Sequence, residues 1–157
     1  MKAKFGAIFA ACCLLFSSCT SKDNYGAVFY DDCKDWIDID FQEGNGVKLE
    51  PLDEKPTELL FTFNNKESEN TVFNSSFELD VDYGEQMFIV YTFASTFAGD
   101  YRLNDIVYAN SIITIKYNKK YIDHNASSGN ACRPYQRWFG LQMNILEAKE
   151  ITFEEII

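Results

Sequence analysis

The sequence predicts an all-β fold: a single β-sandwich, immunoglobulin-like or similar, of about seven to eight strands. First, apolar and polar residues alternate with a period of two in several short segments. Second, these segments lack the three-and-four spacing of apolar residues that an amphipathic helix requires. Third, turn-favouring Gly, Asn and Ser residues lie between the segments. A small closed β-barrel is the alternative architecture.

The first four expected strands lie in the first two thirds of the chain. Residues 36–41, 58–63 and 77–83 each place a row of apolar side chains on one face. This alternation predicts three strands that are buried on one side only. Residues 86–94 are apolar on both faces, which predicts a central strand that is covered on both sides.

The remaining strands are expected in the last third of the chain. Residues 106–117 are rich in β-branched side chains, which predicts one long strand or a bent pair. Residues 138–146 alternate again, and residues 149–157 are the expected last strand. We expect one domain, spanning residues 25–157, with a core of its own.

The N-terminus has the three-part layout of a secretory signal. Lys2 and Lys4 precede an uncharged apolar run of twelve residues, 5–16, which small residues follow. A helix that spans a bilayer needs about 20 apolar residues, so this run is too short to remain as an anchor.

The junction Phe16-Ser17-Ser18-Cys19 resembles a bacterial lipoprotein signal, in which small residues lead directly into a cysteine. The family prefers Leu where Phe16 stands. The resemblance implies cleavage after residue 18, lipidation of Cys19 and a lipid-anchored tether over residues 19–24. Cys12 and Cys13 are rival cleavage points, but cutting there leaves an apolar stretch on the mature end.

The polar tether is similar to that of small lipoproteins of Bacteroidetes, some of which carry a charged patch after the cysteine. Here the matching residues are Lys22 and Asp23. The resemblance implies a bacterial cell-envelope protein, held on the outer membrane by lipid, and leaves open which face it occupies.

Charge excludes one class of partner. Without residues 1–18, the chain has 12 basic and 24 acidic residues, a net charge near −12. Such a surface repels nucleic acid, so we expect no nucleic-acid partner. We also expect no cofactor.

Two cysteines remain once lipid occupies Cys19. Cys33 and Cys132 lie 99 positions apart, and an exported protein meets an oxidising environment. They are therefore candidates for a disulfide bond. Two free, buried thiols are the alternative.

The sequence offers little for catalysis. Its one histidine, His124, lies in a polar stretch, and no serine occupies a Gly-x-Ser-x-Gly turn. The paired carboxylates Asp38/Asp40 and Asp80/Asp82 are compatible with calcium binding or glycoside hydrolysis. Solubility alone explains such acids on the wet face of a sheet. We expect neither a metal site nor an enzyme.

A basic and aromatic segment interrupts this acidic chain. Residues 116–137 contain five Lys and Arg residues against one acidic residue, Asp123. Arg and Tyr are enriched where proteins hold partners, although the cations can equally neutralise nearby acids. The candidate contact residues are Lys116, Lys119, Lys120, Tyr121, Arg133, Tyr135, Arg137 and Trp138.

These observations favour a membrane-anchored, non-catalytic binding module of the cell envelope or cell surface. An acidic protein, a glycan or anionic lipid headgroups would be the partner of the basic segment. One alternative is a carboxylate-dependent hydrolase of envelope glycans or peptides. The other is a structural subunit of an envelope complex, docked through residues 86–94.

Overall fold

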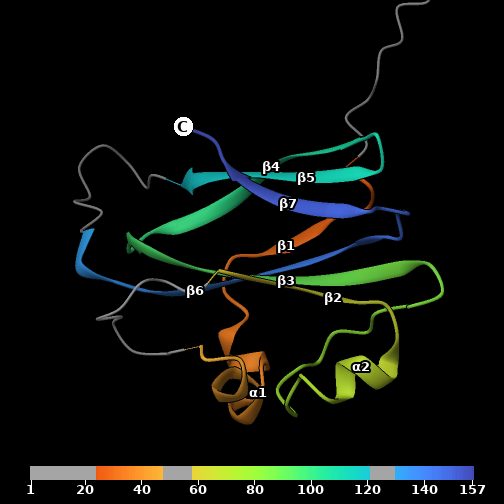
Figure 1. Ribbon diagram of the computed structural model, residues 1–157, viewed down its shortest axis with the longest axis horizontal. Helices are drawn as coiled ribbons and strands as arrows, with labels where there is room; N and C mark the ends of the chain where they lie inside the picture. Colours follow the sequence, from red (N-terminus) through yellow and green to blue (C-terminus); the bar gives the residue numbers. More distant parts are fainter. Residues whose placement is uncertain (1–23, 48–57, 121–129) are drawn as a thin grey trace, which may run out of the picture.

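The structure of the protein is a computed structural model that describes residues 24–47, 58–120 and 130–157 (Figure 1). For residues 130–133 it describes the backbone. Seven strands in this part of the chain form two stacked sheets, which confirms the predicted all-β sandwich. The four-stranded sheet has the order β1-β6-β3-β2, and the three-stranded sheet has the order β4-β5-β7. The bounds are β1 Val28–Tyr30, β2 Leu59–Phe63, β3 Gln86–Phe97, β4 Asp100–Ala109, β5 Ile112–Lys120, β6 Asn130–Asn144 and β7 Glu150–Glu155.

The chain passes between the sheets three times: from β3 to β4, from β5 back to β6, and from β6 to β7. β4 and β5 form a hairpin whose turn residues Asn110 and Ser111 have φ values of 54° and 62°. Two consecutive left-handed residues are typical of a tight hairpin turn. All strand pairs are antiparallel except β5 and β7, which run parallel.

Most side chains between the sheets are aliphatic. Met87 and Ile89 of β3 and Leu141 and Met143 of β6 pack against Ile106, Ile113 and Ile115 of the other sheet. Toward the turn between β3 and β4 this core becomes aromatic. The aromatic cluster consists of Tyr91, Phe93, Phe97, Tyr101, Tyr117 and Phe139.

A third layer covers the opposite face of the four-stranded sheet. It contains α1 (Ile39–Gly44), α2 (Lys66–Asn70) and the segment after α2 (Figure 1). Phe88, Val90 and Trp138 point into this layer and are fully buried. β3 is therefore covered on both faces, as its doubly apolar sequence predicts.

The predicted strand over residues 36–41 is wrong. Lys34–Trp36 is a single 3₁₀ turn, and α1 begins at Ile39. The Asp38 carboxylate accepts hydrogen bonds from the backbone N–H groups of Asp40 (2.8 Å) and Phe41 (3.4 Å). A capping carboxylate satisfies the free N–H groups of a first helical turn, and this local effect outweighs the two-residue alternation.

The predicted strand over residues 77–83 is half right. Its alternation does separate buried from exposed side chains, but the segment belongs to neither sheet. It lies over the four-stranded sheet, where Phe77 stacks on Phe73 at 4.2 Å. The other expected strands correspond to β2, β3, the β4–β5 hairpin, β6 and β7. Three-residue β1 gave no alternation long enough to be recognised.

Candidate functional site

The basic residues that the sequence singled out on β5 are each paired within the chain. Lys116 lies 3.7 Å from Glu154, and Lys119 lies 2.7 Å from Glu155 of the neighbouring strand β7. Lys120 lies 3.8 Å from Asp100 of β4. These are surface ion pairs, which contribute little stability but lower the local positive charge.

Arg137 is buried and clamped. Its guanidinium Nη2 lies 3.0 Å from Oδ1 of Asp31, and its Nη1 donates a hydrogen bond to the Tyr135 hydroxyl over 3.1 Å. The guanidinium also lies over the Tyr101 ring at 5.2 Å. Tyr135 in turn donates to the Phe97 carbonyl oxygen at 2.7 Å. The group ties the segment after β1 to the corner between β3 and β4.

Burial raises the pKa of the Asp31 carboxyl, and the neighbouring Arg137 charge opposes that rise. The ion pair therefore lies in a partly dehydrated environment, where each charge depends on the other. This is the arrangement of a structural clamp.

Trp138 was wrongly predicted as a contact residue. Its side chain is 0% exposed and packs beneath the helical layer. Arg137 points to the opposite face of β6, because successive residues of a strand alternate. The structure therefore separates two neighbours that the sequence grouped. Tyr121 and the side chain of Arg133 lie outside the described residues.

The predicted disulfide between Cys33 and Cys132 is not supported. Cys33 is a free thiol, 1% exposed, and its backbone N–H donates to the Trp138 carbonyl at 3.1 Å. Cys132 lies six positions before Trp138 on β6, which is about 20 Å along a strand. A disulfide needs Cα atoms about 4.4–6.8 Å apart. The Cys132 side chain and Cys19 lie outside the described residues.

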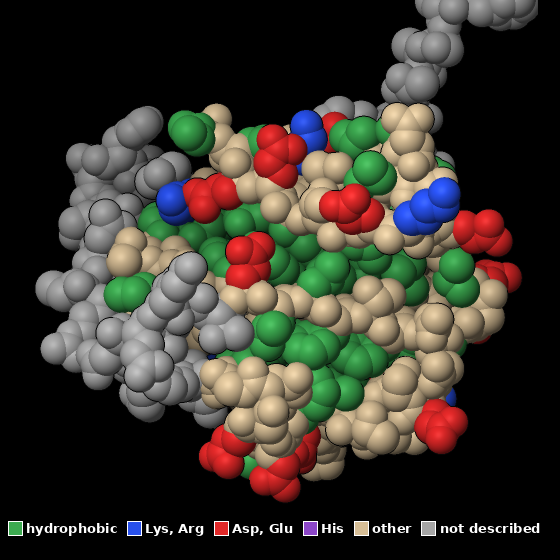
Figure 2. Space-filling view, viewed as in Figure 1, with side chains coloured by type: hydrophobic (Ala, Val, Ile, Leu, Met, Phe, Trp, Pro, Cys, Tyr) green, Lys and Arg blue, Asp and Glu red, His purple; other side chains and the backbone are tan. Residues whose placement is uncertain are grey.

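A hollow of about 460 Å³ lies beside the basic residues and is lined by Arg102, Asn118, Lys119, Lys120, Glu155, Ile156 and Ile157, so its lining is largely charged. Two further hollows, with more apolar linings, lie between β2 and β7, which are outer strands of the two sheets. One hollow of about 390 Å³ adjoins another of about 430 Å³, and both are lined by Leu60 and Ile151. We call the continuous depression the edge groove. Figure 2 shows its band of hydrophobic side chains between the sheets. The two hollows together are lined by Glu58, Leu59, Leu60, Thr62, Asn64, Met87, Tyr91, Ile145, Leu146, Glu147, Ala148, Lys149, Glu150, Ile151, Thr152 and Phe153.

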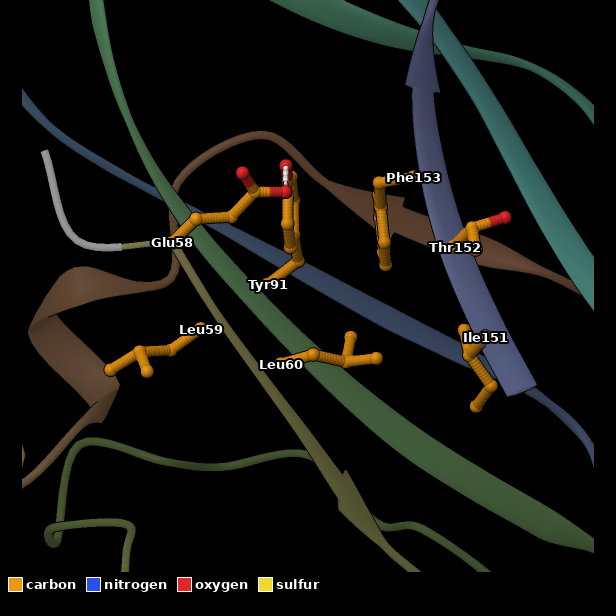
Figure 3. Close-up of a pocket in the computed structure, with 7 residues that line it drawn as sticks. All are labelled: Glu58, Leu59, Leu60, Tyr91, Ile151, Thr152 and Phe153. Carbon is orange, nitrogen blue, oxygen red and sulfur yellow. Dashed lines mark hydrogen bonds between the residues drawn. The ribbon is translucent and has the colours of Figure 1, made fainter. Parts of the chain in front are cut away.

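Strand register brings the apolar residues of the groove together. Leu60 is paired with Tyr91 of β3, so its side chain points toward the three-stranded sheet. Ile151 and Phe153 of β7 are paired with buried Ile113 and Ile115, so they point back toward Leu60. Figure 3 shows these side chains converging from the two strands.

An aromatic pair and a carboxylate close one end of the groove. The rings of Tyr91 and Phe153 stack at 4.2 Å and 9°, which joins the two sheets (Figure 3). The Tyr91 hydroxyl donates to Glu58 Oε1 at 2.6 Å. Burial, with a further effect of Glu58, raises the pKa of the Tyr91 hydroxyl, so it remains a donor at neutral pH.

The groove is acidic at its rims. Glu58 lies at one end, and Glu147, Lys149 and Glu150 line the other hollow. Neither hollow gathers three carboxylates, and no histidine lines either one. In the described part of the chain, no cluster of His, Cys, Asp and Glu is suited to hold a metal ion. The arrangement favours holding an apolar ligand over acid–base or metal chemistry.

Among the described residues, no helix is long and apolar enough to cross a membrane. The chain matches no protein-family model, no curated protein and no solved structure.

The edge groove is not apparent from the sequence. One local signal was present: Leu60 is a large apolar residue on the polar face of the segment 58–63. What makes it a site is that β2 and β7 are the outer strands on the same side of the sandwich.

Proposed function

We propose that the protein is a lipid-anchored binding module of the bacterial cell envelope, which holds its ligand in the edge groove and does not act as an enzyme. The observation that carries the proposal is the groove itself, an open apolar depression between two outer strands. Exposed contiguous apolar surface is typical of interaction sites. The lipoprotein-type signal ending at Cys19 supports the location.

The groove replaces the basic segment as the preferred contact. Lys116, Lys119 and Lys120 each have an acidic neighbour within 4 Å, and Arg137 is 9% exposed. An acidic protein or an anionic headgroup would have to compete with these partners. By contrast, Leu60 is 39% exposed at the groove, and its burial by a ligand is favourable at about 25 cal/mol per Å².

Two other roles lose support from the same geometry. Docking through residues 86–94 requires an exposed face, but β3 is covered on both sides. Stacking of a sugar on Tyr91 requires a free ring face, but Tyr91 lies between Phe93 and Phe153, and stacks on both.

Site-specific photo-crosslinking in living cells tests the proposal. A photoreactive amino acid replaces Leu60 in one strain and Val107 in another; both positions are 39% exposed, but Val107 lies on β4, away from the groove. We expect irradiation to yield adducts from position 60 and not from position 107. Equal labelling from both positions, or none from position 60, would contradict the proposal.

A further inference from the structure

We infer that the ligand of the edge groove is an extended segment of another protein, apolar and flanked by basic residues, which pairs as an added strand with the outer edge of β2. This inference rests on the proposed function, because it names the occupant of the same groove. Addition of a strand to an exposed sheet edge is a general mode of peptide recognition, in which backbone hydrogen bonds supply affinity.

The first support is the regularity of β2. In the described part of the chain, β2 pairs only with β3, so its other edge has no strand partner. Its register runs without a shift from Leu59 opposite Thr92 to Phe63 opposite Phe88. The strand, Leu-Leu-Phe-Thr-Phe, contains neither Lys nor Pro. Sheet edges usually resist pairing through Lys or Pro residues or through a register shift, and β2 has none of these features.

The other three edges are protected. β1 has three residues, too few to template a long partner. β4 has a register shift between Leu103 and Asp105, which interrupts a regular edge. β7 carries carboxylates at Glu150, Glu154 and Glu155. Among the outer strands described, β2 alone is longer than three residues, regular and without a charged residue, so the edge best suited to an added strand also borders the groove.

The groove supplies the side-chain contacts that such a strand needs. Side chains of an added strand alternate between two faces. Those on one face would lie beside Leu60 and opposite Ile151, in the apolar hollow. Those on the other face would lie beside Phe61, whose ring packs on Phe41 of α1 at 5.1 Å. Both rows meet apolar surface, which favours a mainly apolar peptide over a polar one.

The acidic lining of the groove favours basic residues at the ends of the peptide. The groove is lined by three carboxylates, Glu58, Glu147 and Glu150, and by one ammonium group, Lys149. Basic residues flanking the apolar stretch complement this arrangement. A second copy of this chain does not, because the protein carries a formal charge of −10 and would bring the same acids together. A lipid acyl chain would leave the edge N–H and C=O groups of β2 without new partners.

Peptide binding to the full mature chain, purified in detergent, tests the inference by fluorescence anisotropy. The parent probe is a short synthetic peptide that alternates Val with Leu and has Lys at both ends. Two further probes carry N-methyl groups along one backbone edge or along the other. We expect one methylated probe to bind about tenfold more weakly than the parent and the other to retain its affinity, because strand addition uses one edge. A probe with Glu in place of Lys should also bind more weakly.

Leu60→Lys places a charge on the β2 edge, and Val107→Lys is the matched control. We expect Leu60→Lys to weaken the parent peptide by about tenfold, and Val107→Lys by less than about twofold. Thr62→Lys, at a second exposed position of β2, should repeat the loss if Leu60→Lys reduces folding, which circular dichroism reports.

The outcomes separate this inference from the proposed function. If crosslinks form at position 60 but the parent peptide does not bind, or both methylated probes bind as well as the parent, strand addition is wrong and the groove remains a binding site. If the crosslinked species is a dimer of this chain, a second copy occupies the groove and the inference fails. If no crosslink forms, the proposed function itself fails.

Discussion

The two ends of the inter-sheet space differ in what their side chains are available to do. At the corner between β3 and β4, aromatic rings and the Arg137–Asp31 pair fill the space and leave the charged groups buried. At the β2–β7 side, apolar residues line an open groove, and Leu60 remains exposed. Arg137 and Tyr135, which resemble contact residues in the sequence, therefore help to build the closed end. The open end is lined by apolar residues, among them Leu60 and Ile151.

Residue type does not identify a site until the partners of each residue are known. Arg137 is of a residue type that is common in binding sites, but it forms an ion pair with Asp31, more than 100 positions earlier. Leu60 looks like an ordinary strand residue, but no described strand covers it. A recognition site requires groups that are left available, and the topology decides which ones are.

The largest expected effect comes from removing the ring at the centre of the closed end. Phe139 is fully buried and contacts Phe29, Phe93, Tyr101 and Tyr117 at ring-centroid distances of 4.9–5.2 Å. Phe139→Ala should lower the free energy of unfolding by about 4 kcal/mol, because it leaves a cavity among rigid rings. Leu60→Ala should cost about 1 kcal/mol or less, because Leu60 is partly exposed. Urea unfolding measures both; similar losses would remove the distinction between the two ends.

The same comparison shows which parts of the molecule were predictable. The central strands β3 and β6 could be predicted from local pattern. A strand that is covered on both faces is apolar on both, and a strand that is covered on one face alternates apolar and polar residues. Residues 36–41 could not be predicted in this way, because a single side chain, Asp38, caps a helix and overrides the alternation. Residues 77–83 alternate because one row of their side chains packs on the four-stranded sheet. Alternation alone does not show whether the backbone of a segment pairs with another strand.

The candidate site was harder to predict than the fold. The groove depends on β7 lying parallel beside β5 and on β2 being the last strand of its sheet. Both facts are set by contacts between distant segments. Likewise, the partners of Lys116 and Lys119 lie on β7, so their pairing is invisible in the local composition of residues 116–137.

A second, smaller effect tests whether the charged groups of the closed end are structural. Arg137→Ala should lower the free energy of unfolding by about 3 kcal/mol, because it strands a partly buried Asp31 and removes packing over Tyr101. Lys120→Ala is the control, because its pair with Asp100 is exposed, and it should cost less than about 0.5 kcal/mol. Equal effects in urea unfolding would mean that solvent screens both pairs alike.

The smallest expected effect is the pH dependence of that clamp. Burial raises the pKa of Asp31 above its ordinary value of 3.8, so the folded state binds its proton more tightly than the unfolded state does. The contribution of Asp31 is therefore fully present below pH 3.8 and declines as the pH rises through the raised pKa.

Comparing the wild type with Asp31→Asn isolates this contribution, because the amide does not titrate. We expect the difference in unfolding free energy between the two proteins to shift against the wild type as the pH rises from 3.8 through the raised pKa of Asp31. A difference that shifts in favour of the wild type would mean that attraction to Arg137 outweighs burial, and that the closed end is wetter than its packing indicates.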